Sequence, residues 1–411
     1  MESEIEITGN SSVIKRTVGI KKWAPYFAVL WLLYGMNSIV AWFSFSPVIR
    51  IVATMVIIAA SFLMRQHEVT KERRWIAILA FLYMVYATLK QDHLIAYLSV
   101  IISNIPFLCI LFWPNDLLKR TYDVFRKVVI FFAIGSTIIT VLSYVGLTAG
   151  IPHFELGPQS ALHVNRGDFY NVYGIFPELN GIGFLFSRAC GMMEEPGHFS
   201  IVLGFVYLID RYTHRKINPA IIIGAIFTFS STFFLMLLFT EFWNFIVNWK
   251  KAFLYLVCTI VMGLIVYKVL PRDMQDMVYY LAYERNMEKV VDAYDSSGSL
   301  EDALDERANN LGMRVYNQMS FEQKLVGDEG DRDIVLSDYR GFIVKMGFIG
   351  LGLIILISLT TLVGAPLLLK ISLFLSLLMI MLHRAWFFYC PFPYFMSFIA
   401  CSLYRFKLKT L

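Results

Sequence analysis

Long apolar runs alternate with short polar or charged segments along most of the chain. A helix needs about 20 mostly apolar residues to cross the hydrocarbon core of a bilayer. The pattern therefore predicts an all-α fold, a polytopic membrane helix bundle of about 12 transmembrane helices with two large extracytoplasmic loops. The predicted spans are residues 23–43, 47–64, 75–89, 94–113, 128–148, 198–210, 217–230, 231–248, 252–270, 340–360, 365–383 and 387–404.

The side on which each loop lies follows from its basic residues, because Lys and Arg gather in cytoplasmic loops. The N-terminal tail, residues 65–74, the segment after residue 118, residues 210–216, Lys250 with Lys251 and the C-terminal "RFKLK" are all basic and all fall on one side. Both termini are then predicted to be cytoplasmic. Residues 217–248 could form one long span, but a division at Ser230–Ser231 keeps the alternation of sides consistent.

Two long segments fall on the opposite, extracytoplasmic side. The second of them, 271–339, is acidic, with 16 Asp or Glu and 8 Lys or Arg between Pro271 and Arg340, and it is partly helical by apolar spacing. The predicted organisation is a cytoplasmic tail (1–22), helices 1–5 (23–148), a first outer loop (149–197), helices 6–9 (198–270), the second outer loop (271–339), and helices 10–12 with a basic C-terminus (340–411).

Composition narrows the possible functions. The 411 residues are 57% hydrophobic and carry a net charge of +5, with a mean hydropathy of +0.61. No GxxxxGK[ST] phosphate loop is present, which argues against an ATP-driven pump. The five cysteines form no CxxC pair and no HExxH motif occurs, so neither a metal nor another cofactor is expected. The positive charge follows from the topology, so nucleic acid is not a predicted partner.

Polar residues gather in "SRACGMMEEPGHFS", directly before an apolar run. Arg188, Glu194, Glu195 and His198 lie here around a Pro-Gly break. Ionisable residues at the membrane are costly, so they are candidates for function. The alternatives are an interfacial arginine that reaches lipid headgroups and a carboxylate that caps the following helix.

Further ionisable residues lie at or near predicted span ends. Four arginines are predicted at one outer depth, although scattered interfacial residues would give the same pattern: Arg50, Arg188, Arg340 and Arg384. Lys345 lies just below the outer surface and either reaches headgroups or lines the same cavity as Arg188. Glu241 lies inside a span, where interior hydrogen bonding is its expected role. Asp338 is the carboxylate of the second loop nearest the membrane.

These motifs in combination resemble the O-antigen polymerase and ligase superfamily, which includes the Wzy-type polymerases. The resemblance covers most of residues 75–404 and rests on an R-x-x-G-x-x-x-E/N-P element, with Glu in this chain, on a Ser-rich turn before the next helix, and on "SDYRGFIVKMGFIGLGLIIL" after the large outer loop. The residues concerned are Arg188, Gly191, Glu195, Pro196 and Ser230–Ser231.

The resemblance implies a membrane-embedded glycosyltransferase of the bacterial inner membrane, without a cofactor. Its substrates would be undecaprenyl-pyrophosphate-linked oligosaccharides on the outer leaflet, and its partners membrane lipid, a chain-length regulator and a flippase. Glu195 is then expected to be the general base, and Arg188 is expected to bind the leaving pyrophosphate. Residues expected to bind the substrate's phosphates or glycan are Arg314, Arg340, His198, Asp338 and Lys345.

The sequence departs from the ligases of this superfamily at one position. Those ligases carry a His ahead of the G-x-x-G element, which is Gly347 to Gly350 here. In those ligases the His is followed by Asn, Ser or Gln and then by nine residues before G-x-x-G. Counting back from Gly347 therefore places Leu336 at the His position and Ser337 after it. This departure favours a polymerase over an oligosaccharide ligase. A lipid-linked oligosaccharide flippase is the alternative of another class.

Overall fold

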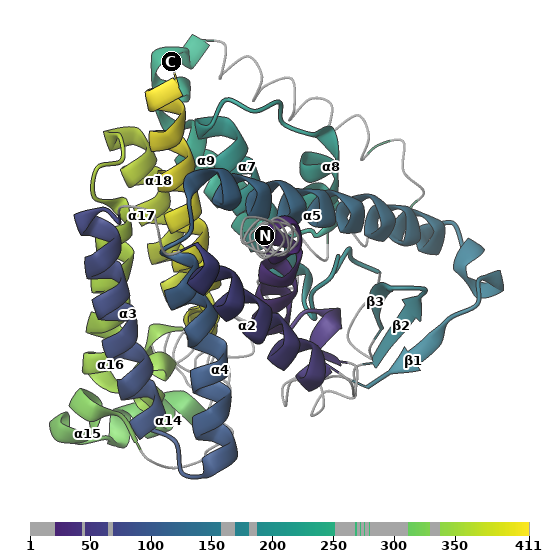
Figure 1. Cartoon of the computed structure of the whole chain (residues 1–411). Helices are drawn as coiled ribbons and strands as arrows, with labels where there is room; N and C mark the ends of the chain where they lie inside the picture. The colour runs from purple at the N-terminus through teal and green to yellow at the C-terminus, as the bar shows by residue number, and fades with distance from the viewer. Residues whose placement is uncertain are drawn as a thin grey trace, which may run out of the picture.

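The computed structural model describes residues 21–42, 46–64, 69–157, 169–180, 187–250, 268, 272, 275, 279, 311–328 and 338–410. These residues are mostly helical, which confirms the predicted all-α class (Figure 1). Residues 21–35 form the first helix. The elements of the first half are η1 (Ile39–Trp42), α2 (Ser46–Leu63), α3 (Lys71–Leu89), α4 (Leu94–Ile110), α5 (Asn115–Tyr144), η2 (Leu147–Gly150), β1 (Phe154–Leu156), β2 (Phe169–Tyr173) and β3 (Phe176–Asn180). The elements of the second half are α7 (Pro196–Tyr212), α8 (Pro219–Phe227), α9 (Ser231–Val247), α14 (Leu311–Gln318), α15 (Phe321–Val326), α16 (Tyr339–Leu362), α17 (Leu367–His383), η4 (Ala385–Tyr389) and α18 (Phe392–Thr410).

Helices lie at the predicted spans throughout the described residues, although their ends differ. The largest shift is in α5, which begins at Asn115 rather than at 128. Its early turns are amphipathic, with Leu117, Leu118 and Tyr122 buried, so the charged residues beside them did not end the helix. The predicted span 252–270, apart from residue 268, lies outside the described residues. So do the predicted helices of the second loop before Leu311, apart from residues 272, 275 and 279.

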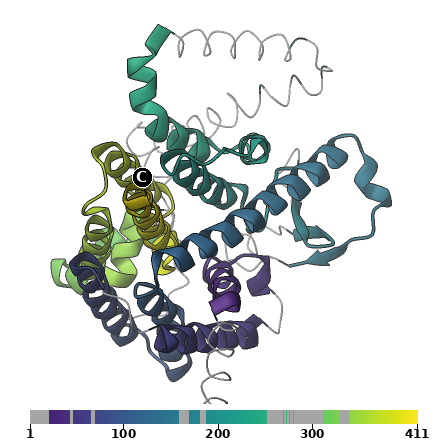
Figure 2. The same ribbon diagram turned by 45° about the horizontal axis from the view of Figure 1, so that its top comes forward.

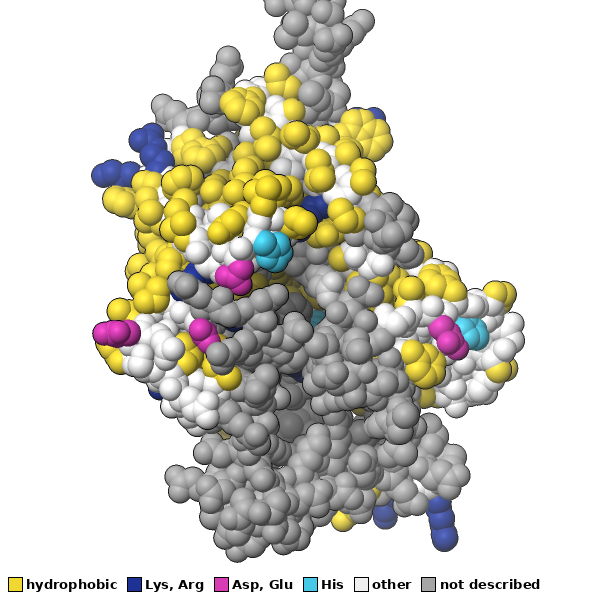
Figure 3. Space-filling model, turned by 90° about the horizontal axis from the view of Figure 1, so that it is seen from below, with side chains coloured by type: hydrophobic (Ala, Val, Ile, Leu, Met, Phe, Trp, Pro, Cys, Tyr) yellow, Lys and Arg dark blue, Asp and Glu magenta, His cyan; other side chains and the backbone are white. Residues whose placement is uncertain are grey.

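Two of the described helices, α5 and α16, are long and apolar enough to cross a membrane by length and composition. Four shorter apolar helices of 10–17 residues accompany them: Pro47–Leu63, Leu94–Ile110, Ser231–Val247 and Leu367–His383. Large apolar side chains are exposed on many helices, for example Met55 on α2 at 63% and Leu367 on α17 at 70%. Figure 3 shows apolar side chains over much of the described surface on one face. Twelve crossings remain a prediction.

The division of residues 217–248 at Ser230–Ser231 is confirmed. Helix α8 ends at Phe227 and α9 begins at Ser231, where Ser230 is the N-cap and its hydroxyl accepts a hydrogen bond from the Thr232 N–H. Serine is a favoured N-cap residue because its oxygen satisfies an otherwise free N–H group of the first turn. With 9 residues, α8 is about 13.5 Å long, roughly half of a bilayer core.

A small antiparallel sheet lies in the predicted first outer loop, where no strand was expected. Its order is β1-β2-β3, and Figures 1 and 2 place it beside the far end of α5. Along β2 the side chains of Tyr170 and Val172 are buried while Phe169 is exposed, the two-residue alternation of a strand. The strands are too short to give the long apolar runs on which the span prediction rests.

Two helices form the centre of the bundle. Every residue of α7 from Pro196 to Asp210 is buried, as are Phe392 to Cys401 of α18. Helix α7 packs against α8 and α9, and α18 packs against α5, α7 and α16. A helix that is buried on all sides is held rigidly, so the N-terminus of α7 is a fixed point in the fold.

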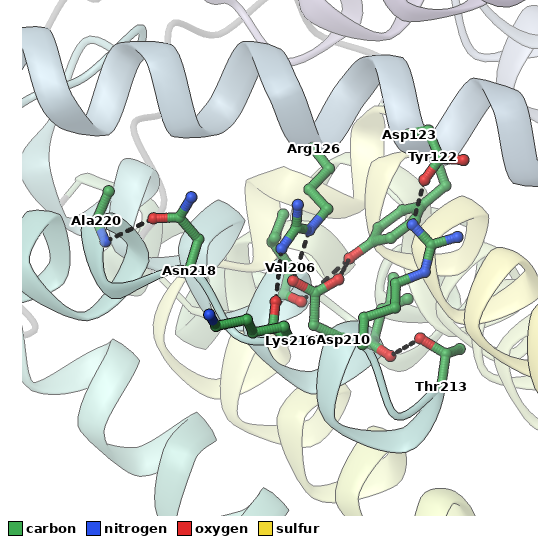
Figure 4. Close-up of polar contacts among 11 residues, drawn as sticks. Tyr122, Asp123, Arg126, Val206, Asp210, Thr213, Lys216, Asn218 and Ala220 are labelled. Atoms are coloured by element: carbon green, nitrogen blue, oxygen red, sulfur yellow. Dashed lines mark hydrogen bonds and ion pairs between the residues drawn. The ribbon is translucent and has the colours of Figure 1, made fainter.

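Buried charges fix the other end of α7 to α5 (Figure 4). Asp210 has no exposed surface; it accepts hydrogen bonds from the Tyr122 hydroxyl at 2.8 Å and from Arg126 Nε at 2.6 Å. Arg126 also donates to the Lys216 carbonyl at 2.8 Å. The carboxylate is paired and hydrogen-bonded, as a buried charge requires.

Glu241 of α9 makes the interior hydrogen bonds expected for it. Its carboxylate accepts from Arg211 Nε at 2.6 Å, from the Tyr207 hydroxyl at 2.9 Å and from Asn244. Residues of α7 and α9 are thereby joined near their predicted cytoplasmic ends.

The segment of the second loop around Gly327 docks into a break in α16. Gly347 has φ +61° and ψ 179°, which interrupts the helix, and only glycine adopts such angles readily. The chain at Gly327 lies against this break so closely that a Cβ on either glycine would overlap the other segment. Tyr86 of α3 donates toward the carbonyls of Val326 at 2.6 Å and Met346 at 2.9 Å. Gly347, the first glycine of the G-x-x-G element, thus positions the part of the second loop around Gly327.

Candidate functional site

The segment from Ser187 to Glu195 enters α7 under restraint from several distant parts of the chain. The Tyr144 hydroxyl donates to the Ser187 carbonyl at 2.6 Å, and the Ile39 N–H to the Met192 carbonyl at 2.8 Å. Tyr170 of β2 donates to the Glu194 carbonyl at 2.9 Å. Hydrogen bonds from α5, η1 and the sheet therefore fix the polar stretch that the sequence singled out.

Gly191 makes the turn at the centre of this segment. Its φ is +62°, and its N–H donates to the Ser136 hydroxyl at 3.0 Å. A Cβ at this position would overlap the buried ring of Phe199 on α7. The glycine of the R-x-x-G-x-x-x-E-P element is thus required both by its backbone angle and by close packing.

We expect Gly191→Ala to destabilise the protein. The left-handed backbone conformation costs a residue with a Cβ about 1–2 kcal/mol, and displacing the ring adds about 1–3 kcal/mol. The measurement is thermal unfolding of the purified protein in detergent. Gly352→Ala on α16 is the matched control, because a Cβ there meets nothing within 4 Å, and an unchanged midpoint for Gly191→Ala would contradict the packing described.

Glu195 is the N-cap residue of α7, but its carboxylate makes no capping hydrogen bond. Its Oε2 lies 3.1 Å from Arg384 Nη1 and 3.3 Å from His198 Nε2. The carboxylate lies beside Arg384, and Pro196 disfavours a helical backbone at Glu195, whose φ is −121° and ψ 144°. The side chain therefore makes no capping hydrogen bond, but it still lies at the N-terminus of α7, where the helix dipole favours an anion.

The side chains of Glu195 and Arg384 are partly exposed, whereas the imidazole of His198 is buried. The side chain of Arg384 is 31% exposed, that of Glu195 15% and that of His198 6%. The ring of His198 also lies edge-on to Phe387 of η4, with centroids 5.4 Å apart. Arg384 lies beside Gly197, where a Cβ would be 3.2 Å from its Nη2. A carboxylate and a guanidinium thus share one partly open position, with a buried histidine behind the carboxylate.

Glu194 points elsewhere. Its Oε2 accepts a hydrogen bond from Asn37 Nδ2 at 3.3 Å, and the residue is 4% exposed. The two adjacent carboxylates therefore have different surroundings. Both residues precede the first helical residue, Pro196, so the 100° spacing of a helix expected from the sequence does not apply here.

Arg188 holds the turn between α8 and α9. Its Nε and Nη2 donate to the Thr228 carbonyl at 2.9 and 2.7 Å, and Nη2 donates to the Phe229 carbonyl at 2.9 Å. These carbonyls end α8, where the helix dipole favours a cation. The sequence placed Arg188 beside the carboxylate; in the contacts that the structure describes, the guanidinium beside Glu195 is that of Arg384.

The remaining predicted site residues lie at the start of α16 and in the second loop. Asp338 caps α16 by accepting from the Arg340 N–H at 3.0 Å, and its other oxygen accepts from Arg340 Nε at 2.9 Å. Lys345 is on the exposed face of α16. Arg314 lies on α14, with its side chain outside the described residues. Asp338 and Arg340 therefore form a local pair, and Arg50 of α2 donates to the Ser99 carbonyl at 3.0 Å.

Two charged residues of this region were missed as site residues. From the sequence, Arg384 was only one of four arginines predicted at the same outer depth of the membrane. No spacing in the sequence links it to Glu195. Glu178 of β3 is 3% exposed, and the strand makes an antiparallel bridge with Ala189 next to Arg188. A charged residue at an inward position of a short strand is the signal that could have identified it.

Two features of the described residues concern thiol and metal chemistry. Burial raises the pKa of the Cys190 thiol to about 12, so it is protonated and a poor nucleophile near neutral pH. Within the described part of the chain, no group of three or more His, Cys, Asp or Glu side chains could hold a metal ion.

Comparisons with known protein families, with curated proteins and with solved structures give no significant match for this chain.

Proposed function

We propose that this chain is a membrane-embedded polymerase of undecaprenyl-pyrophosphate-linked oligosaccharide repeat units. The proposal takes its reaction class from the resemblance of the Arg188-to-Pro196 element to the O-antigen polymerase and ligase superfamily. The single observation that carries the site is the Glu195–Arg384 contact at 3.1 Å. It joins a potential base and a potential phosphate-binding group at the N-terminus of the buried helix α7.

The reaction needs both groups at one place. A hydroxyl of one lipid-linked unit attacks the anomeric carbon of the chain on another, and the bond from that carbon to the pyrophosphate oxygen breaks. The hydroxyl proton passes to the Glu195 carboxylate. Undecaprenyl pyrophosphate leaves with the bonding electron pair, and Arg384 stabilises its developing charge. Arginine suits this role because its planar guanidinium binds phosphate through two parallel hydrogen bonds.

Neighbouring residues position this pair. His198, buried behind Glu195, orients the carboxylate, so the substrate-binding role expected from the sequence becomes a positioning role. Arg188 keeps the carbonyls that end α8 in place, so that Ser230 reaches Ser200 of α7 at 2.9 Å. In this proposal Arg188 acts through the fold, and Arg384 takes the role at the pyrophosphate. Arg340, Asp338, Lys345 and Arg314 remain candidates for contact with the glycan or a second phosphate.

The apolar helices support a multi-pass location in the bacterial inner membrane. Helices α5 and α16 have the length and composition of spans, and the exposed apolar side chains of α2 and α17 suit contact with lipid. In this setting the N-terminus of α7 faces the outer leaflet, and both chain termini lie in the cytoplasm. A membrane location also gives the long lipid tail of the substrate direct access.

A strain that lacks the gene tests the reaction class. Its surface glycan, resolved on a gel, should show single repeat units attached to their carrier and no ladder of longer chains, and the wild-type gene should restore the ladder. Complete loss of attached glycan would instead indicate the ligase or flippase alternative and would contradict the proposal.

A further inference from the structure

A small cavity lined by both polar and apolar side chains lies at the ends of helices that are predicted to be cytoplasmic, whereas Glu195 is predicted to lie on the outer side. It has a volume of about 80 Å³, and its lining includes Arg73 of α3, Asn115 of α5, Thr361 of α16, and Ser402 and Arg405 of α18. Four helices thus contribute polar groups to one enclosed space. The proposed polymerase reaction uses none of them.

Arg73 is held rigidly at this cavity. Its Nη1 donates to the carbonyls of Trp113 at 2.6 Å and Leu111 at 3.3 Å, and Nη2 donates to the Asn115 side chain. All of these acceptors are neutral. Burial, and to a lesser extent the nearby charge of Arg405, lower the pKa of Arg73 to about 10.

Arg405 has fewer hydrogen-bond partners than Arg73 among the described residues. Its Nε is buried and has no hydrogen-bond partner among the described residues. Its guanidinium lies against the backbone of Gly364, where φ is +76°. A buried donor of a cation that lacks an acceptor is unfavourable, and a bound acceptor would remove this penalty.

The surrounding groups favour an anion. Helix α3 begins at Lys71 after the N-cap Thr70, and α5 begins at Asn115; both Thr70 and Asn115 line the cavity. The N-terminal ends of helices attract negative charge. Glu72 also lines the cavity, and with its charge counted the formal charge of the lining is still positive.

We propose that this cavity binds a phosphate group between Arg73 and Arg405, with the hydroxyl of Ser402 as a further donor. The volume of about 80 Å³ compares with about 10–15 Å³ for one water in the same measure, which leaves room for the five heavy atoms of a phosphate. The group comes either from an anionic lipid of the inner leaflet or from free phosphate.

The test measures binding of the purified full chain. Thermal unfolding in detergent is followed as sodium phosphate replaces sodium chloride at constant ionic strength, because a ligand of the folded state raises the midpoint. In a second arm the chain is placed in phosphatidylcholine nanodiscs with and without phosphatidylglycerol. A rise in the phosphate arm identifies free phosphate, and a rise in the lipid arm alone identifies the lipid headgroup.

The variants decide whether the rise comes from this cavity. Loss of a charge-assisted hydrogen bond should weaken binding about ten- to hundred-fold in Arg405→Gln. Arg74→Gln removes the same charge from an exposed neighbour on α3 and should bind as the wild type does. If Arg405→Gln does not fold, Arg405→Lys, which keeps the charge but loses the planar fork, should also bind more weakly. No rise in either arm, or an equal rise in wild type and both Arg405 variants, overturns the proposal.

Discussion

Glu195→Gln is expected to lower the rate of chain extension by about 10²- to 10⁴-fold, the usual effect of losing a positioned general base. Glutamine has nearly the same shape, but its amide cannot accept the hydroxyl proton. Its amide oxygen can still accept a hydrogen bond from Arg384 Nη1, which lies 3.1 Å from Glu195 Oε2, so the change should leave folding and substrate binding intact. The measurement is extension of purified lipid-linked repeat units by the purified variant.

Glu194→Gln is the matched control for this prediction. The two residues are adjacent and lose the same charge, but Glu194 accepts a hydrogen bond from Asn37 Nδ2 rather than from the arginine of the site. We expect it to stay within a few-fold of the wild-type rate. Equal rates in the two variants would remove Glu195 as the base, and Glu178, the buried carboxylate of β3, would be the next candidate.

Arg384→Gln is expected to reduce extension by about 10²- to 10³-fold, as for loss of one group that stabilises charge in a transition state. Arg384→Lys should recover part of this loss, because lysine keeps the charge without the two-pronged geometry. The turnover rate should fall more than substrate affinity, because the charge on the pyrophosphate grows as the bond breaks. Steady-state kinetics with increasing concentrations of lipid-linked units separates the two quantities.

His383→Gln provides the comparison for Arg384→Gln. His383 is the last residue of α17 and is exposed, so its replacement should leave the rate unchanged. If Arg384→Gln extended chains at the wild-type rate, the ion pair with Glu195 would be structural, and the pyrophosphate would need another cation.

The apolar pattern predicted the helices well because burial and membrane insertion both select long apolar runs. The span prediction missed the early turns of α5, because their apolar residues lie on one face of the helix among charged neighbours. The sheet was not predicted because its strands are too short to give a clear apolar pattern: β1 has 3 residues, and β2 and β3 have 5 each. Local rules therefore identified most helices but not the short elements that tertiary contacts stabilise.

The sequence predicted where the candidate site lies along the chain, but not which side chain contacts Glu195. The Pro-Gly break and the preceding Glu195 marked the start of α7, and the proline correctly indicated that the backbone of Glu195 is not helical. Arg188 is near Glu195 in the sequence, yet its described hydrogen bonds go to the carbonyls of Thr228 and Phe229. Arg384 comes from the far end of the chain, and its position depends on the packing of α17 and η4.

Release of undecaprenyl pyrophosphate by the purified wild-type chain tests the central claim most directly. The chain would be placed in nanodiscs with defined lipid-linked repeat units, and released lipid and glycan length would be measured together. The account predicts one undecaprenyl pyrophosphate for each new glycosidic bond and a series of products that lengthen by whole repeat units. Glycan that never lengthens, with no undecaprenyl pyrophosphate released, would contradict it.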